Sequence, residues 1–341
     1  MAGVKALRVT ELAHEDTSTP GTWLEATTRW RGTGMIKDNM VTVFVPEDIG
    51  NYGGSTNTYI QRYGGEIVVE QDANFTQINY PLQAGIVGPV AGVADDSSGS
   101  VYTYTYTMPT TAQNEFATYS FTAGDDTGAE KLSYCFVPNF SLTGTAGEAL
   151  QLSATFRGQQ VEPATLSDTA VVPVPVDYIL MSMGALWIDD DTAVAIATTA
   201  ISNSLIGMTL DVNTGLQEVF AASGTKKFAF VKRVQPEITL QLTFEHDASS
   251  IAQKVKWRAG TACQIRLNFT GSAVTTPGQY DYNLLQIDMA GKWDTWDVIG
   301  ENNGNDIVTG TFRAKYSADA NAAAGLFCTF LVVMDGLATL P

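Results

Sequence analysis

The residues whose types could support chemistry are few in this chain and lie far apart. Histidine occurs only as His14 and His246, and neither has a serine or cysteine nearby in a nucleophile motif such as Gly-x-Ser-x-Gly. Oxygen-rich runs occur at residues 189–191 and 301–306, but neither has the spacing of a calcium loop with its closing glutamate. Solvated turns are the favoured interpretation. The sequence therefore predicts no enzyme, no catalytic residue, no metal ion and no other cofactor.

The three cysteines do not form a binding motif either. Cys135, Cys263 and Cys328 stand far apart in strand-like contexts, with no Cys-x-x-Cys or Cys/His spacing. Buried free thiols are the expected outcome.

No uncharged apolar stretch is long enough to span a membrane, and the first residues lack the apolar core of a secretory signal. We therefore expect synthesis inside the cell and no membrane contact.

Charge narrows the choice of partners. The formal net charge is −17, and basic residues are nowhere concentrated enough to offer a phosphate-binding patch. Specific or tight binding to nucleic acid is disfavoured because an acidic surface repels it. Solubility alone could also explain this charge, so the charge does not decide the function.

The elements that would position any site are mostly β-strands. Residues 237–245 alternate apolar and polar side chains, which is typical of a strand with one buried face. Asp247 then predicts a helix N-cap, residues 248–258 a helix with Ile251 and Val255 one turn apart, and Gly260 its end. This strand followed directly by a helix is the unit on which the rest of the analysis is built.

The same unit occurs earlier in the chain. In residues 66–85, Asp72 and Gly85 correspond to Asp247 and Gly260, although Pro81 would kink or end the first helix. Downstream, residues 153–157 (SATFR) match residues 309–313 (TGTFR). Two matches in the same order indicate an internal duplication, with an insertion of roughly 19 residues in the first half. Chance similarity between two β-rich halves is the alternative.

Length and composition agree with two β-rich units. We expect residues 1–31 to form an exposed arm, residues 32–173 a first domain and residues 174–341 a second, joined through a proline-rich linker at 159–175. Strict alternation of aromatic residues and threonine at 101–108 predicts a strand with an exposed row of either tyrosine or threonine at a sheet edge or an interface.

Several segments of this chain resemble the phage major tail tube proteins of long, non-contractile (siphophage) tails. They are residues 31–48, the unit at 66–85, the run 135–157, and the C-terminal run 282–341. The resemblance implies two tandem domains, each a β-sandwich or barrel with one short flanking α-helix. It also implies stacked rings that form a tube in the virion tail. The implied partners are further copies of the chain, the tape-measure protein, the tail terminator and tail-tip proteins, and DNA in transit.

The resemblance leads to expectations about individual residues. Polar or acidic side chains on the wet strand faces should line a channel through which DNA slides without sticking. They are Glu66, Glu70, Thr239, Gln241, Thr243 and Glu245; an ordinary solvated strand face is the alternative. The repeat alignment pairs Glu70 with Glu245 and Glu66 with Gln241. The candidates for contacts between rings come from loops 46–58 and 219–227 and are Asp48, Asn51, Tyr52, Lys226 and Lys227.

Two alternatives remain open at the level of the assembly and of the function. If each ring has six domain positions, a chain with two such domains needs three copies, which gives a trimeric ring with pseudo-sixfold symmetry. A homohexamer with one domain in the wall and one outside is the other arrangement. The competing function is a carbohydrate-binding or adhesin β-sandwich, for which Tyr102, Tyr104 and Tyr106 would supply an exposed aromatic patch.

Overall fold

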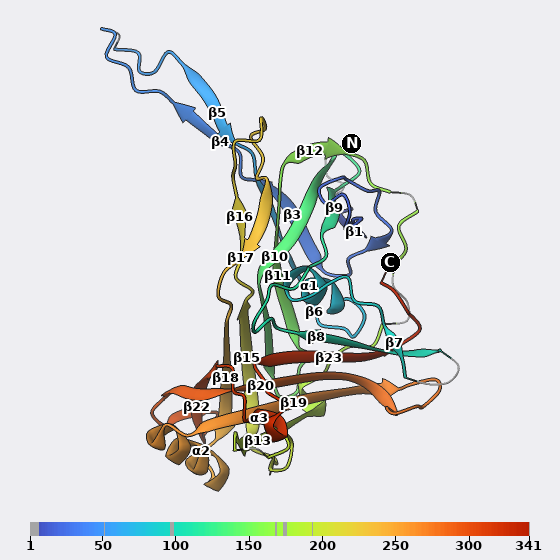
Figure 1. The fold of residues 1–341 in the computed structure, drawn as a ribbon, viewed down its shortest axis with the longest axis vertical. Coiled ribbons are helices and arrows are strands. Elements are labelled where there is room, and N and C mark those ends of the chain that lie inside the picture. Colours follow the sequence, from blue (N-terminus) through green and yellow to red (C-terminus); the bar gives the residue numbers. More distant parts are fainter. Residues whose placement is uncertain are drawn as a thin grey trace.

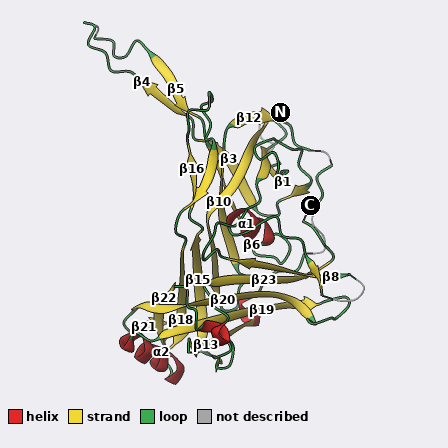
Figure 2. Cartoon of the chain, viewed as in Figure 1, coloured by secondary structure: helices red, strands yellow, loops and turns green. Residues whose placement is uncertain are grey.

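The computed structural model describes residues 7–50, 52–95, 99–167, 169–172, 176–192 and 194–340. The chain is mainly β, with few and short helices (Figures 1 and 2), as the sequence predicts. Among the described residues, no helix is long and apolar enough to cross a membrane. The predicted linker at 159–175 extends into residues 173–175, which lie outside the described residues.

The elements of the first half run from the N-terminus to residue 164. They are β1 (Val9–His14), β2 (Thr28–Arg29), β3 (Thr33–Asp38), β4 (Val41–Phe44), β5 (Thr58–Arg62), β6 (Gly65–Asp72), α1 (Asn79–Gly85), β7 (Val93–Ala94), β8 (Val101–Thr107), β9 (Tyr119–Gly124), β10 (Ala129–Thr145), β11 (Gln151–Gly158) and β12 (Val161–Ala164).

The elements of the second half follow from residue 181. They are η1 (Met181–Met183), β13 (Gly184–Asp190), β14 (Ala200–Ile201), β15 (Leu205–Asn213), β16 (Leu216–Val219), β17 (Phe230–Arg233), β18 (Glu237–Glu245), α2 (Ala248–Ala259), β19 (Ala262–Ala273), β20 (Tyr282–Trp296), β21 (Gly300–Asn302), β22 (Asn305–Ala314), α3 (Ala320–Ala323) and β23 (Cys328–Asp335).

One sheet runs through both halves, and we call it the shared sheet. Its antiparallel order is β3–β6–β11–β10 from the first half, then β15–β18–β22–β20 from the second. The two halves meet where β10 pairs with β15, from Asn139 opposite Asn213 to Thr145 opposite Gly207. The halves are therefore joined edge to edge by backbone hydrogen bonds.

A second sheet packs behind the shared sheet in each half. In the first half its order is β1–β9–β10–β12, with β2 beside β1. In the second half it is β13–β19–β20–β23. The long strands β10 and β20 belong to both sheets of their half, so each bends from one layer into the other. This gives each half a sandwich of two sheets.

The two halves share one topology. In each, a hairpin joins the first two strands of the shared sheet: β4–β5 between β3 and β6, and β16–β17 between β15 and β18. A helix follows the second strand, α1 after β6 and α2 after β18. The order of strand pairing is also the same in both sheets. Such agreement across a whole sandwich supports the proposal of an internal duplication.

A β-bulge at the same place in both halves supports it independently. The pairing of β10 with β11 slips by one residue between Phe136 and Asn139, and the pairing of β20 with β22 slips between Trp293 and Thr295. Both slips lie opposite the SATFR and TGTFR segments that match in sequence. Because bulges are kept as specific features within related folds, this coincidence points to common descent.

The halves differ in their helices. Asp247 caps α2 by accepting a hydrogen bond from Ser250 N, and Gly260 ends it at a φ of 65°, as the sequence predicts. The first helix begins later than expected, at Asn79, which places Pro81 in the first turn, where the missing N–H is tolerated. All of α1 is buried, whereas Ile251 and Val255 of α2 are exposed.

The insertion in the first half is the segment that contains β7 and β8. It lies between α1 and β9, where the second half has only a short turn from α2 to β19. β8 crosses to the second half and pairs with β23. Of the two rows that could be exposed, the threonines are exposed at Thr105 and Thr107, whereas Tyr104 and Tyr106 are fully buried. Burial raises the pKa of Tyr104 to about 12.

Within the described residues 7–31 of the predicted N-terminal arm, strand β1 is packed rather than exposed, whereas residues 16–20 are exposed. β1 pairs with β9 along its whole length, and Leu12 and Ala13 are buried. The buried carboxylate of Glu11 pairs with Arg29 at 3.1 Å. The expectation failed because this strand is covered on both faces, so it lacks the alternation that would have marked it.

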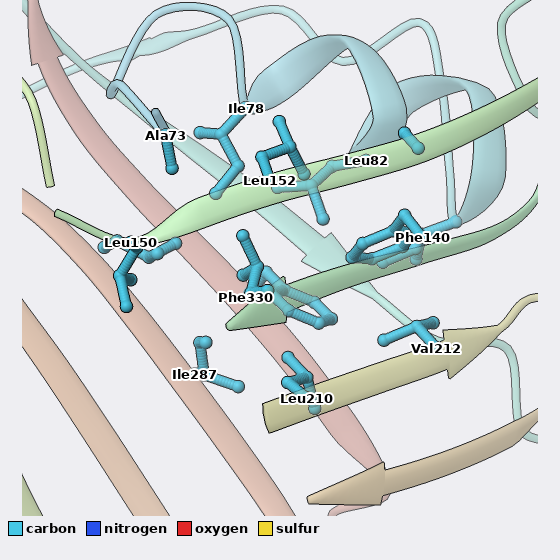
Figure 3. Packing of buried hydrophobic residues seen from close by; sticks show 14 of the residues in the cluster. Ala73, Ile78, Leu82, Phe140, Leu150, Leu152, Leu210, Val212, Ile287 and Phe330 are labelled. Atoms are coloured by element: carbon cyan, nitrogen blue, oxygen red, sulfur yellow. The ribbon is translucent and has the colours of Figure 1, made fainter. Parts of the chain in front are cut away.

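Behind the shared sheet, side chains from both halves form one core. Figure 3 shows Phe140 and Leu152 of the first half near Leu210 and Val212 of the second, with Phe330 among them. The ring centroids of Phe140 and Phe330 are 6.0 Å apart. The continuous core fixes the angle at which the two parts of the shared sheet meet.

Candidate functional site

All six residues predicted to line a channel lie on one face of the shared sheet, which we call the polar face. Strict alternation in β6 and β18 buries Ile67, Val69 and Leu240 and turns the intervening polar side chains outward. The outward residues include all of the predicted set: Glu66, Glu70, Thr239, Gln241, Thr243 and Glu245. The structure thus brings together residues that are up to 179 positions apart in the sequence.

The neighbouring strands extend this face. β11 presents Ser153 and Thr155 on it, β10 presents Ser141 and Thr143, and β15 presents Thr209. The hydroxyls of Thr243 and Thr309 lie 3.1 Å apart across the β18–β22 pair. Short hydroxyl side chains therefore cover much of the polar face, beside the exposed apolar side chains of Val68 and Met35.

The repeat alignment of these residues needs a correction of two positions. Glu70 lies opposite Ser153, and the matching Thr309 lies opposite Thr243 rather than Glu245. The structural counterpart of Glu70 is therefore Thr243. The sequence alignment was anchored on the helix starts, and α1 begins after an extra turn, which the alignment did not allow for. The shift is even, so the face on which the residues lie is unchanged.

Acidic side chains outnumber basic ones on the polar face, and most of the basic ones are engaged. Lys37 Nζ lies 2.7 Å from Glu66 Oε1, and Arg313 lies 2.6 Å from Glu237. Lys292 donates to the carbonyl of Gly260 at 2.6 Å. The hydrogen bond from Lys37 lowers the pKa of Glu66, which keeps this carboxylate charged. Glu70, Glu245 and Asp211 add further negative charge.

The shared sheet ends in two open edges. Within the described residues, β3 pairs in this sheet with β6 alone, and residues 293–296 of β20 pair with β22 alone. Open edges present unpaired N–H and C=O groups that favour pairing with another chain. Sequence analysis did not identify these edges, because which strand ends a sheet depends on long-range pairing.

The loops predicted to contact other rings differ in setting. The β4–β5 hairpin projects away from the rest of the molecule (Figure 1), and Asp48 and Tyr52 at its tip are exposed. Asn51 lies outside the described residues. By contrast, the carbonyl of Lys226 accepts from Tyr63 N at 3.0 Å. Lys227 lies 4.0 Å from Glu162, so the second loop rests on the first half of the same chain.

The residues considered for chemistry have structural roles. Asp189 is buried in β13 rather than in a solvated turn; burial raises its pKa, but hydrogen bonds from Thr198 and Thr199 outweigh that effect and lower it. His14 packs edge-on against Tyr119, and burial lowers its pKa. The three cysteines are free and buried, as expected. In the part of the chain that the structure describes, no three His, Cys, Asp or Glu side chains gather to hold a metal ion.

Comparison with known proteins identifies one family. The family model described as phage tail tube protein matches residues 50–324, which covers most of both halves and every strand of the shared sheet except β3. Comparison with curated proteins finds no match.

Proposed function

The chain belongs to the phage tail tube protein family, a structural component of the virion tail, and on that premise we propose that its copies close into rings through the open edges of the shared sheet. The observation that carries this proposal is the sheet itself: two alike halves are already joined edge to edge, and within the described residues each end of the sheet is a strand with no further strand beside it. Ring closure satisfies both edges without leaving any free.

We propose that each ring contains three copies. Each chain supplies two structurally alike units, so three chains give the pseudo-sixfold arrangement that six single-unit chains would give. The homohexamer with one unit outside the wall is disfavoured because both units belong to the same sheet, and a shared sheet cannot have one half in the wall and the other outside it.

The polar face lines the channel in this assembly. Glu66, Glu70 and Glu245, together with the hydroxyls between them, present negative charge and short polar groups to DNA. Most lysine and arginine side chains on this face are already paired, so few are free to replace the counterions of DNA and hold it. DNA would pass through without specific binding, and the same channel would house the tape-measure protein before ejection.

Rings would stack through their rims, and the ends of the tube would meet the tail terminator and tail-tip proteins. The exposed tip of the β4–β5 hairpin, with Asp48 and Tyr52, is the proposed contact to the next ring. The carbohydrate-binding alternative is not pursued, because two tyrosines of its aromatic patch are buried in the core.

Electron microscopy and native mass spectrometry of the purified full-length chain test this proposal. We expect rings or tubes with a central hole, and solubilised rings with the mass of three chains. Six chains per ring would contradict the trimer, and a chain that stays monomeric at high concentration would contradict ring formation altogether.

A further inference from the structure

We propose that the junction between neighbouring copies repeats the junction inside the chain, so that β20 of one copy pairs with β3 of the next and Asp297 lies opposite Lys37 of the neighbour. This inference rests on the proposed ring and adds to it the two strands, their register and one ion pair. It follows from the pairing of β10 with β15, which already joins a first unit to a second within one chain.

The register comes from following equivalent residues through the sheet. Ser141 in β10 lies opposite Ser153, whose sequence match is Thr309. The backbone N–H of Asp297 donates to the carbonyl of Thr309 at 2.9 Å. Asp297 therefore occupies in the second half the position that Ser141 occupies in the first.

Lys37 is located in the same way at the opposite edge. Arg157 and Arg313 match in sequence, and they lie opposite Glu66 and Thr239. On the next strand, Glu66 lies opposite Lys37, and Thr239 lies opposite Asp211. Lys37 therefore corresponds to Asp211.

The internal junction supplies the last step. Ser141 lies directly opposite Asp211 where β10 meets β15. Replacing each residue by its counterpart places Asp297 opposite Lys37 of the next copy, a pair of opposite charges. In the same register Thr295 lies opposite Asn39 of the next copy. Beyond Asp297 the pairing with β22 slips by one residue, so we carry the register no further.

The backbone hydrogen-bonding groups at both edges already have the orientation that this register requires. Across the internal junction, Thr214 N donates to Pro138 O and Ala146 N to Ile206 O, so the even-numbered pairs carry the hydrogen bonds. Asn39 N donates inward to Gly64 O, as Asp297 N does to Thr309 O. At both edges, the backbone N–H and C=O groups of the even-numbered residues next to Lys37 and Asp297 therefore point away from the chain's own sheet. Asp297 and Lys37 form a non-hydrogen-bonded pair, in which side chains approach most closely.

Exposed apolar side chains mark the same edges. Val298 is 86 % exposed and Ile299 51 %, directly after Asp297, and Met35 on β3 is 46 % exposed. They lie beside the proposed ion pair on the two strands. Bringing the edges together would place these apolar side chains close to the neighbouring copy and reduce their contact with water, which favours association. The charge pair then serves to select the register.

A cavity beside β22 fits the same junction. It has a volume of about 700 Å³ and is lined by Pro236, Lys315 and Tyr316, among others. The equivalent site on the first half is filled by the β16–β17 hairpin, where Gln159 donates to Phe228 O at 2.8 Å. The matching hairpin of the next copy is β4–β5, whose Phe44 is exposed. Its stem would occupy this cavity.

Cysteine cross-linking in assembled rings tests the register. The variant Lys37→Cys/Asp297→Cys should form a disulfide between chains, because the two Cα atoms would lie within reach of each other. A non-reducing gel should then show a ladder that ends at three chains. The native cysteines are buried and add no background. Losing the exposed Lys37–Glu66 pair should cost little stability. Asn39→Cys/Thr295→Cys is a second, uncharged pair in the same register.

Matched controls separate the register from mere proximity. Each single cysteine should give no ladder, and Met35→Cys/Asp297→Cys, displaced by two residues on the same face, should cross-link at least tenfold more slowly. Rings in the microscope with no ladder from either predicted pair, or with the displaced pair favoured, would overturn this inference and leave the ring intact. A wild-type chain that forms no ring would reject the proposed function itself.

Discussion

The buried carboxylate of Glu15 shows how individual residues of this fold act as anchors. It accepts hydrogen bonds of 2.8 Å from Gly21 N, Thr118 Oγ1, Ser120 Oγ and Tyr134 N. These donors come from separate strands and from the chain after β1. One carboxylate therefore fastens the N-terminal segment to the back sheet of the first half.

Removing this anchor should unfold the first half more easily. Glu15→Ala leaves several buried donors without an acceptor, and we expect the free energy of unfolding to fall by about 2–4 kcal/mol. Urea denaturation of the unassembled monomer would measure the change. Asp16→Ala is the matched control, because Asp16 is exposed and bonds only to the nearby Ser18; it should change stability by less than about 0.5 kcal/mol. Equal losses in both variants would contradict the anchoring role.

At the scale of elements, the two hairpins are equivalent in topology but not in environment. β16–β17 packs against the first half, where the rings of Tyr134 and Phe228 stack with centroids 5.0 Å apart. At its end, the buried Arg233 donates to the last carbonyls of α1, Gly85 O at 2.7 Å and Ile86 O at 3.0 Å. Burial lowers the pKa of Arg233 to about 10. The β4–β5 hairpin contacts the second half near its base, where the Arg62 guanidinium lies 5.6 Å from the centre of the Phe220 ring, and it projects beyond that contact.

Shortening the two hairpin tips should therefore have different effects. Replacing residues 46–57 by a short glycine turn should leave the thermal unfolding of the monomer unchanged but abolish tube formation. Replacing residues 221–226 in the same way should lower the melting temperature as well, because the Lys226 contact to Tyr63 is lost. Calorimetry and electron microscopy of both variants measure these outcomes. Tubes of normal length from the first variant would reject its role in stacking.

The sequence predicted elements whose signal is local and missed those that depend on distant partners. The alternation in β18, the Asp247 cap and the Gly260 end were all found, because each is encoded within a few residues. β1 was missed and assigned to an exposed arm, because it is buried on both faces and so lacks alternation, and because its buried Glu11 finds its partner, Arg29, outside the strand. The polar face was predicted from alternation, but its open edges were not, because pairing over long distances decides which strand lies last.

At the scale of the whole molecule, part of the negative charge lies on the polar face. The net charge of −17 includes Glu66, Glu70 and Glu245 on the polar face, while lysine and arginine there are largely engaged. Stacked rings would repeat this arrangement along the whole tube. A polyanion inside such a wall meets many weak repulsions and few attachment points.

Reversing charge on the polar face should make DNA adhere. In assembled tubes, Glu70→Lys/Glu245→Lys should retain DNA fragments at low salt and release them steeply as salt rises, because each phosphate contact displaces counterions. Co-sedimentation across a salt series would measure this. Asp126→Lys/Asp319→Lys carries the same charge change at exposed turns away from the polar face. Equal retention by both double variants would contradict the location of the channel.

The β8 strand has a consequence for the mechanics of the tube. It ties the first half to β23 of the second within one chain, but no comparable strand follows α2 to reach the next copy. In a closed ring, junctions between units that are bridged by β8 would alternate with junctions that lack such a strand. A tail that bends or is pulled should then separate first at the junctions between copies, which are every second junction in the ring. Its outer surface should carry ridges with threefold rather than sixfold spacing.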